Sequence, residues 1–254
     1  IANVTETVAQ TLPVLQGAVD DTNEAPWMTM PEFQYFVARL LVGILRLHAE
    51  RRNLGWHVTG ELSVITPKPE VGTLTLGPDV LVVEADGRLR DSWDVRQEGK
   101  PPRLVLEIVT HDSVERDTVD KPGYYAQMGV EEYVLFWPER KDGGPKLFGY
   151  HRDNDGTWVE WAVDAAGVLR SAVLHGLGLQ VGEHPWLRVV DEHGARLPSP
   201  EEEAARAERE AARALGEAAR AEREAARAER EAARAAAAEA ELARLRTALE
   251  RQQG

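Results

Sequence analysis

The sequence predicts an α/β (α+β) domain with a central mixed sheet flanked by helices, followed by a long C-terminal helix. Several short β-rich runs are separated by turn residues. Between two of these runs lies a segment with helical spacing, as in a strand–helix–strand crossover. After Pro200 the chain consists almost entirely of Ala, Glu and Arg. We therefore expect an N-terminal arm over residues 1–26, one domain over residues 27–197, and a helical tail over residues 198–254.

The first helix is expected from Pro31 to about Arg51. Pro31 and Glu32 suit a first turn, where a backbone N–H is not needed and a negative charge faces the positive end of the helix dipole. The apolar residues that follow recur at helical spacing and form one wide face. They are Phe33, Phe36, Val37, Leu40, Leu41, Ile44, Leu45 and Leu47.

The strands and the second helix follow from turn signals and periodicity. The segment DSVERDTVDKPGYYAQMGV (112–130) has helical spacing and reaches Gly129, a residue that commonly ends a helix. RDNDG (152–156) predicts a hairpin turn between two strands. The predicted strands are GELSVI (60–65), DVLVV (79–83), RLVLEIV (103–109), YVLFW (133–137), KLFGY (146–150) and TWVEW (157–161).

The C-terminal tail is a repeat of seven residues. EAARAER occurs at 203–209, 217–223 and 224–230, with the variant EAARALG at 210–216. Alanine is a strong helix former, and Glu and Arg three residues apart attract each other. The alanines also recur at coiled-coil spacing, with Leu242 and Leu249 near the end, but they bury only methyl groups. Two interpretations remain open, a weak coiled coil that aids dimerisation and a solvated single helix.

Composition excludes several classes of site. The chain has no Cys, so it forms no disulfide, no thiolate zinc site and no thiol nucleophile. The longest apolar run, Leu40–Leu45, is much shorter than the ~20 residues that span a bilayer. A basic segment followed by an apolar stretch would predict secretion, and the sequence shows no such pattern. We therefore expect a cytoplasmic protein. The net charge of -13 disfavours general binding to nucleic acid, which would need a local basic patch.

A carboxylate in the middle of an apolar strand points to function. Because side chains alternate along a strand, Glu107 shares its face with Val105 and Val109. The residues that point to the opposite face are apolar as well, as in a strand covered on both sides. An isolated carboxylate in such a place costs several kcal/mol. Protonation, a cationic partner or a metal ion would relieve that cost.

A second carboxylate and a lysine favour the metal ion. Asp79 follows Pro78 at the start of another apolar strand, and two carboxylates on adjacent strands repel unless a divalent cation bridges them. Mg²⁺ is typically held by one or two carboxylates together with waters and phosphate oxygens. Lys121 lies near the start of the crossover helix, from which its ammonium reaches the edge of the strand. Such a set predicts metal-assisted hydrolysis of a phosphodiester.

These motifs, in this order, resemble the Uma-type family of restriction endonucleases, which is similar to a branch of the PD-(D/E)xK nuclease superfamily. The resemblance covers about residues 28–190 and implies a restriction endonuclease-like core. It implies that Asp79 is the PD aspartate and Glu107 the acidic residue of the (D/E)xK element. The stretches that carry it are PDVLVV (78–83), RQEGKPPR (96–103), LVLEIV (104–109), Asp117 with Lys121, and YYAQMGVEEYVLF (124–136).

The lysine departs from the superfamily pattern, because Val109 stands two residues after Glu107. The family pattern moves the lysine into the next helix, and Lys121 matches that placement. Because proline interrupts a helix interior, Lys121 has to lie near the start of its helix if Pro122 is to follow it. Asp117 is expected to support Lys121 or the helix N-terminus.

Each site residue also has a purely structural interpretation. Glu107 pairs with Arg103 or Arg116 in that case. Asp79 then caps a turn after Pro78. Lys121 is then a surface lysine whose stem packs on the protein and whose ammonium reaches water.

We expect a Mg²⁺- or Mn²⁺-dependent endonuclease that acts on DNA, with Asp79 and Glu107 as metal ligands and Lys121 as the third catalytic residue. The alternative is a catalytically inactive nuclease-fold scaffold protein that assembles through its helical tail, which the acidic balance favours. For either, a homodimer through a sheet edge or through the C-terminal helix is possible, and no membrane partner is expected. The nearest basic cluster in the sequence supplies candidate phosphate contacts, namely Arg88, Arg90, Arg96, Lys100 and Arg103.

Overall fold

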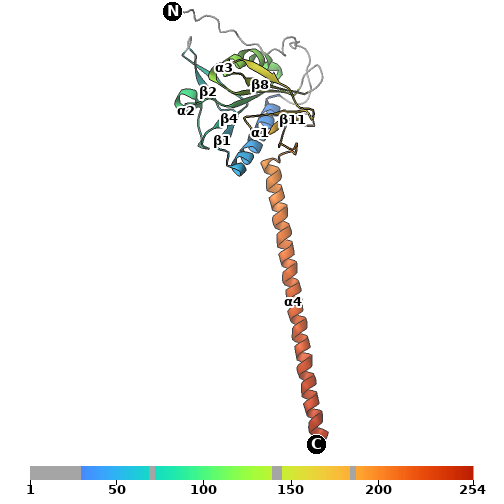
Figure 1. Ribbon diagram of the computed structural model, residues 1–254. Coiled ribbons are helices and arrows are strands. Elements are labelled where there is room, and N and C mark those ends of the chain that lie inside the picture. The colour runs from blue at the N-terminus through green and yellow to red at the C-terminus, as the bar shows by residue number, and fades with distance from the viewer. Residues whose placement is uncertain (1–29, 69–71, 139–144, 184–186, 254) are drawn as a thin grey trace, which may run out of the picture. The chain divides into compact units, whose positions relative to one another are not determined.

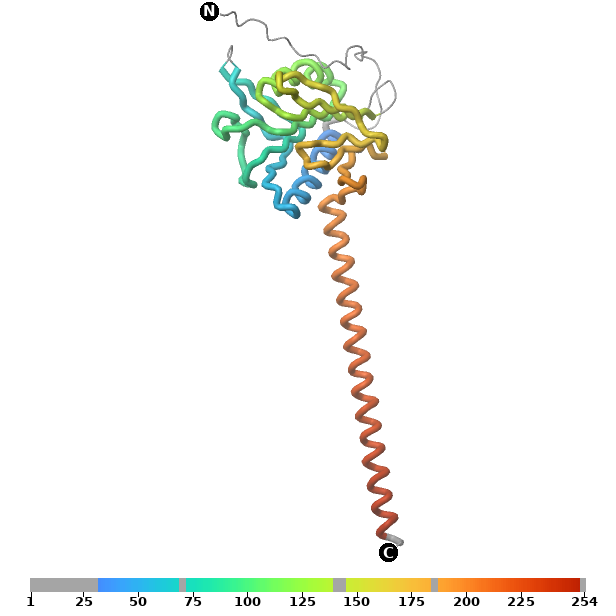
Figure 2. The backbone as a smooth tube through the Cα atoms, viewed as in Figure 1, coloured from blue at the N-terminus to red at the C-terminus, as the bar shows by residue number. Residues whose placement is uncertain are grey.

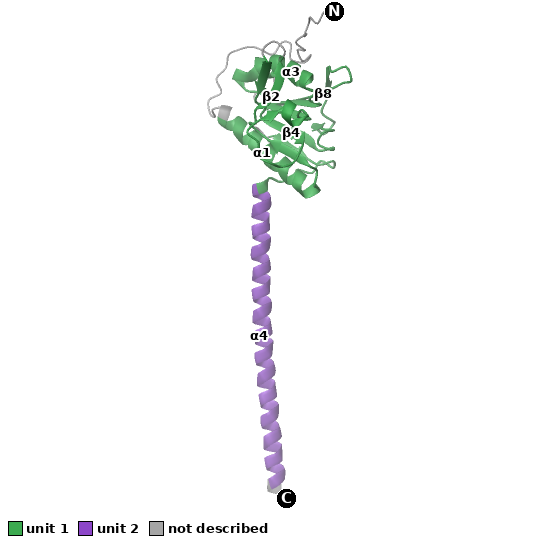
Figure 3. Ribbon diagram, turned by 90° about the vertical axis from the view of Figure 1, so that its left-hand side faces the viewer, with its two compact units in different colours: residues 1–200 green, residues 201–254 purple. Residues whose placement is uncertain are grey.

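The structure, a computed structural model, describes residues 30–68, 72–138, 145–183 and 187–253. The chain divides into two compact units, residues 1–200 and residues 201–254 (Figure 3). The arm expected over residues 1–26 lies outside the described residues. Within the described ranges, no helix combines the length and the apolar composition that a membrane crossing requires.

The centre of the first unit is a six-stranded mixed sheet with the order β1-β4-β6-β7-β8-β9. Its strands β1, β4 and β8 are labelled in Figure 1. Neighbours are antiparallel except for the central pair β6 and β7, which is parallel. This sheet confirms the predicted α/β class with a mixed sheet. Its strands are β1 (Trp56–Thr59), β4 (Val80–Glu84), β6 (Leu104–Ile108), β7 (Glu132–Trp137), β8 (Lys146–Arg152) and β9 (Trp158–Trp161).

The parallel pair requires a crossover, and the chain between β6 and β7 supplies it. A short 3₁₀ turn (His111–Ser113) and a π-helical turn (Arg116–Asp120) lead into α3 (Lys121–Met128). Gly129 ends α3 with φ 97°, in the left-handed region that favours glycine, as the sequence predicts. The π-helical turn is not predictable from spacing, and such turns are frequent at functional sites.

One face of the sheet is covered by α1 (Met30–Arg52) and by a small sheet of β10 (Val168–Arg170), β11 (Gly178–Val181) and β12 (Leu187–Val190). The helix confirms the one expected from Pro31 to about Arg51. Leu104 and Ile108 of β6 pack into this layer.

The other face is covered by α3 and by a second small sheet, in the order β3-β2-β5. Val105 and Val109 pack here, so the apolar side chains of the strand alternate between the two layers as predicted. The elements of this layer are β2 (Val64–Lys68), β3 (Gly72–Leu76), β5 (Trp93–Asp94) and the short α2 (Val95–Glu98) that follows β5.

The segment predicted as one strand over residues 60–65 contains a turn instead. β1 ends at Thr59 and β2 begins at Val64, and between them Glu61 has φ 57°. Gly60 is required here, because a Cβ at this position would lie 2.7 Å from the carbonyl oxygen of Asp79. The two strands join different sheets, so a continuous run in the sequence is interrupted by tertiary contacts.

The described residues of the second unit all belong to α4 (Pro200–Gln253), which confirms the predicted long helix (Figure 2). Arg206, Arg213 and Arg227 pair with glutamates four residues later, and Arg244 pairs with Glu241 three residues earlier. The distances are 3.0 Å for Arg206–Glu210, 2.8 Å for Arg213–Glu217 and 2.9 Å for Arg227–Glu231.

Candidate active site

Asp79 and Glu107 meet at one end of the β4–β6 ladder. Val80 pairs with Leu106 in this antiparallel ladder, so that Asp79, one residue outside β4, stands across from Glu107. The backbone N–H of Asp79 donates to Glu107 Oε2 over 3.3 Å. The strand order therefore brings together two carboxylates that are 28 residues apart in the sequence.

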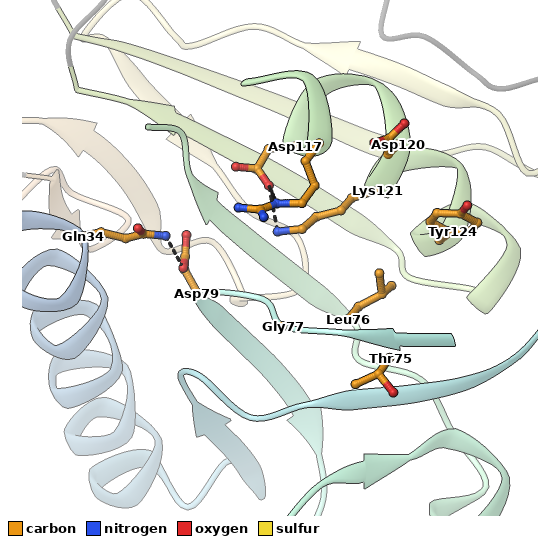
Figure 4. Close-up of a pocket in the computed structure, with 10 residues that line it drawn as sticks. Gln34, Thr75, Leu76, Gly77, Asp79, Asp117, Asp120, Lys121 and Tyr124 are labelled. Carbon is orange, nitrogen blue, oxygen red and sulfur yellow. Dashed lines mark hydrogen bonds and ion pairs between the residues drawn. The ribbon is translucent and has the colours of Figure 1, made fainter. Parts of the chain in front are cut away.

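The Asp79 carboxylate is held between a strand and a helix. Its Oδ2 accepts a hydrogen bond of 2.6 Å from the backbone N–H of Ile108, directly after Glu107. Its Oδ1 accepts a bond of 2.6 Å from Gln34 Nε2 on α1 (Figure 4). Burial raises the pKa of Asp79, although these two bonds to its charged form act against the rise. The side chain is thus oriented by two fixed donors.

Glu107 is buried, with 1% of its surface exposed. Its Oε1 accepts a hydrogen bond of 2.8 Å from Tyr125 Oη and lies 2.9 Å from Lys121 Nζ. Burial raises the pKa of Glu107 to about 8, while the ammonium of Lys121 acts in the opposite direction. The cation beside this carboxylate is therefore Lys121, and neither Arg103 nor Arg116.

The crossover helix supplies three polar side chains to this place. Asp117, Lys121 and Tyr125 follow one another at intervals of four residues, so they lie along one side of the helical segment. Lys121 Nζ lies 2.7 Å from Asp117 Oδ1 (Figure 4), which agrees with the expected supporting role of Asp117. Burial opposes the charge on Lys121, but Glu107 and Asp117 together raise its pKa, so the lysine stays protonated.

Lys121 is the first residue of α3, and Pro122 lies in the first turn, where a missing N–H is tolerated. This placement is the one that the sequence required of a lysine followed by proline. Tyr133 Oη donates a 2.6 Å hydrogen bond to the carbonyl oxygen of Asp117, which holds the π-helical turn against β7.

A polar cavity of about 610 Å³ opens beside these groups. Asp79 and Lys121 line it, whereas Glu107 is not among the lining residues and is almost fully buried. Figure 4 shows Asp79 and Lys121 on opposite sides of this space, on the strand side and the helix side. The residues that line the cavity are Gln34, Thr75, Leu76, Gly77, Asp79, Arg116, Asp117, Asp120, Lys121 and Tyr124.

A divalent metal ion fits this donor set with two protein ligands. The described part of the chain contains no group of three or more His, Asp or Glu side chains placed to hold a metal. Mg²⁺ commonly takes one or two carboxylates and fills its remaining positions with water and substrate oxygens. Burial raises the pKa of both Asp79 and Glu107, so a metal ion that binds here has to displace a proton from Glu107. Asp79 and Glu107 are therefore the residues that would hold the ion.

The five basic residues predicted as phosphate contacts do not line the cavity. Lys100 is exposed. The other four donate to carboxylates: Arg88 and Arg90 to Glu98, Arg96 to Asp94, and Arg103 to Glu84 and Glu131. The structure thus brings Asp79, Glu107 and Lys121 together, and it leaves the basic cluster elsewhere on the domain.

Sequence reasoning assigned no role in the site to Tyr125 or Gln34, and it considered Arg116 only as a structural partner of Glu107. Tyr125 lies one helical turn after Lys121, a spacing that could have identified it. Arg116 directly precedes Asp117 and lines the cavity, with its Nε 3.9 Å from Asp117 Oδ1. Gln34 had no signal in the sequence, because only the packing of α1 against the sheet brings it to Asp79.

Comparison with known proteins identifies the family of the chain. The model of the Uma2 family, described as "Putative restriction endonuclease", matches residues 24–182. A search among curated proteins finds no match. A crystal structure from Anabaena variabilis, described as "a putative nuclease belonging to DUF820", is similar with 13% identity and a TM-score of 0.33. The match covers 48% of this chain and 69% of that chain. Because this family model matches more than half of the chain, the chain belongs to the Uma2 family.

Proposed function

We propose that the protein is a Mg²⁺- or Mn²⁺-dependent endonuclease that hydrolyses phosphodiester bonds of DNA. The observation that carries the proposal is the position of Lys121 Nζ, 2.9 Å from Glu107 and 2.7 Å from Asp117, at the wall of the cavity that Asp79 lines. Two acidic ligands with an ammonium beside them are what the hydrolysis of a charged diester needs.

Asp79 and Glu107 are assigned as the metal ligands. A bound divalent ion supplies Lewis acidity toward a phosphoryl oxygen and lowers the pKa of a water molecule. Gln34 and the N–H of Ile108 hold the Asp79 carboxylate, and Tyr125 holds the Glu107 carboxylate through Oε1. Glu107 Oε2, the oxygen that faces the N–H of Asp79, is then turned toward the other ligand.

Lys121 is assigned to the phosphate. Its ammonium is protonated and buried, and in such surroundings it stabilises negative charge on a phosphate oxygen more strongly than in water. Asp117 also pairs with the lysine, so the ammonium is held by two carboxylates and not by Glu107 alone. Of the cavity-lining residues, Arg116 is the additional cation placed to contact a phosphate. Arg88, Arg90, Arg96, Lys100 and Arg103 remain proposed contacts to more distant phosphates of a duplex.

The proposal is tested by cleavage of plasmid and linear duplex DNA in Mg²⁺ or Mn²⁺, together with calorimetric titration of the metal. Asp79→Asn, Glu107→Gln and Lys121→Ala are each expected to abolish cleavage. The two carboxylate variants are also expected to weaken metal binding, whereas Lys121→Ala retains it. Glu132→Gln is the matched control, because Glu132 is likewise buried but bonds Ser171 and the backbone near it.

Three outcomes would contradict the proposal. Cleavage by Glu107→Gln at the wild-type rate would show that the assigned residues are wrong. Loss of activity in Glu132→Gln, with folding retained, would show that activity depends on buried carboxylates in general and not on this site. A wild-type protein that binds no divalent ion and cleaves no DNA would favour the inactive scaffold instead.

A further inference from the structure

The second unit carries a short apolar seam on α4, near its C-terminal end. At 1.5 Å per residue this helix is about 80 Å long. Leu242, Leu245 and Leu249 are 56%, 58% and 59% exposed. Their spacing of three and then four residues places them along one line of the helix, at positions a, d and a of a heptad. Ala235 and Ala238 extend the same line by one heptad.

We propose that this seam pairs with the same seam of a second copy of the chain, as a short parallel two-stranded coiled coil over residues 234–249. The proposal concerns α4 alone and does not depend on whether the protein cleaves DNA. The partner is a second copy of the chain, because the charged residues beside the seam of one copy are complementary to those beside the seam of the other.

The flanking charges define both the partner and the direction. In a parallel dimer each g residue faces the e residue of the next heptad of the partner, and such pairs select the partner. Arg234 at g then faces the partner's Glu239 at e. Glu241 at g likewise faces the partner's Arg246. Both pairs have opposite charges, and the twofold symmetry of a homodimer doubles them.

An antiparallel dimer fits this seam less well. With the leucines aligned, Leu249 would face the partner's Ala238, and the core layers would combine one large and one small residue. Arg234 and Glu241 would lose their oppositely charged partners. In the parallel arrangement each leucine meets its own copy, so the three leucine layers are filled evenly.

The seam does not continue toward the start of α4. In the same heptad phase every d position before Ala238 is a glutamate, and burying those like charges against their copies would be strongly unfavourable. These positions are Glu203, Glu210, Glu217, Glu224 and Glu231.

The alanine seam of the repeat lies in a different phase and is flanked by glutamates on both sides. In that phase Glu217 at g would face the partner's Glu222 at e, and Glu224 would face the partner's Glu229. The arginines of the repeat are instead bonded within the helix, as in Arg213–Glu217 and Arg227–Glu231. Residues 203–233 are therefore a single, unpaired helix about 45 Å long that precedes the dimer contact along α4.

Sedimentation equilibrium of the full chain over a range of concentrations tests the proposal. The weight-average mass is expected to rise with concentration toward twice that of the chain. Leu245→Glu is expected to abolish this rise, and the matched control Leu215→Glu, at an exposed leucine off the seam, is expected to leave it unchanged. A chain that stays monomeric at every concentration, or equal effects of the two variants, would overturn the proposal.

Charge reversal tests the pairing. Glu241→Arg and Arg246→Glu are each expected to weaken dimerisation about tenfold, because each places like charges in two symmetric pairs. The double variant is expected to restore the wild-type affinity. Failure of the double variant to recover, although each single variant weakens the dimer, would rule out this register.

A single introduced thiol tests the direction, since the chain has no other cysteine. Ala238→Cys is expected to form a disulfide-linked dimer under mild oxidation, because the two copies of position 238 lie at the same level of a parallel seam. A dimer by mass that does not crosslink at this position would contradict the parallel arrangement.

Discussion

Tyr125 Oη donates a 2.8 Å hydrogen bond to the same oxygen of Glu107 that lies 2.9 Å from Lys121 Nζ. Two side chains from successive turns of α3 thus hold one oxygen of a buried carboxylate and leave its other oxygen toward Asp79. This arrangement makes Tyr125 a positioning residue in the proposed site, although its ring also packs in the apolar core.

Tyr125→Phe removes this hydrogen bond and keeps the ring. An intramolecular hydrogen bond contributes about 0.5–1.5 kcal/mol, so we expect a loss of stability of that order and, because the Glu107 carboxyl is no longer oriented, a tenfold or greater fall in cleavage rate. Tyr133→Phe is the matched control, because Tyr133 is also buried but donates to the backbone of Asp117. It is expected to cost about 1 kcal/mol and to leave cleavage within a few-fold of wild type. Chemical denaturation and cleavage assays check both. Equal losses of activity would indicate that Tyr125 acts through packing alone.

The raised pKa of Glu107 predicts how the stability of the metal-free protein depends on pH. Between about 4.5, its ordinary value, and about 8, the folded protein keeps a proton that the unfolded chain releases. The contribution of Glu107 to the free energy of unfolding is therefore present at low pH and is lost as the pH rises toward 8, by at most ~1.4 kcal/mol per pH unit.

Glu107→Gln is expected to flatten that dependence, because the amide does not titrate. Urea denaturation in the presence of a chelator, from pH 5 to pH 8, measures the difference in slope between the wild type and the variant. Parallel curves would show that Glu107 is ionised in the folded protein across this range. Asp79, whose pKa is also raised by burial, contributes a slope of the same sign in both proteins.

Gln34 is expected to control metal affinity without touching the metal. Its side-chain amide holds Asp79 Oδ1 at 2.6 Å, and loss of such an orienting bond typically weakens metal binding 10–100-fold. Gln34→Ala should show this weakening by calorimetry, with a matching rise in the Mn²⁺ concentration needed for half-maximal cleavage. Arg39→Ala, an exposed position on the same helix, should leave both unchanged. An unaltered metal affinity in Gln34→Ala would mean that Asp79 is held well enough by Ile108.

Substitutions of Arg116 and of the basic cluster (residues 88–103) are expected to affect DNA binding differently. Arg116→Ala, in a Glu107→Gln background that prevents cleavage, should weaken duplex binding and reduce the slope of log affinity against log salt by about 1. Arg96→Ala should have a smaller effect on both, because Arg96 is engaged with Asp94 and its proposed contact is to a more distant phosphate. Fluorescence anisotropy at several salt concentrations measures both. A larger effect of Arg96→Ala would place the DNA along the loop that the sequence indicated.

Local patterns in the sequence were sufficient for much of the fold. The alternation around Glu107 predicted the two apolar faces of β6, and the helical spacing up to Gly129 predicted the crossover. The heptads predicted the long helix. These features depend on periodicity within one element, which the order of residue types expresses directly. The strands β10, β11 and β12 were not predicted, because short strands carry too few residues to show a period.

The contacts of the site depend on the packing of elements that are distant in the chain. The ladder between β4 and β6 was needed to place Asp79 across from Glu107, and the seating of α1 was needed to bring Gln34 to Asp79. The sequence suggested Arg103 or Arg116 as the cationic partner of Glu107, whereas the path of α3 brings Lys121 to it. The arginines of the basic cluster appeared free in the sequence, yet Arg103 is paired with Glu131, 28 residues away. Charges are screened or satisfied by their neighbours in space, so the sequence alone determined which groups exist and which faces they share, while the tertiary structure determined which of them meet.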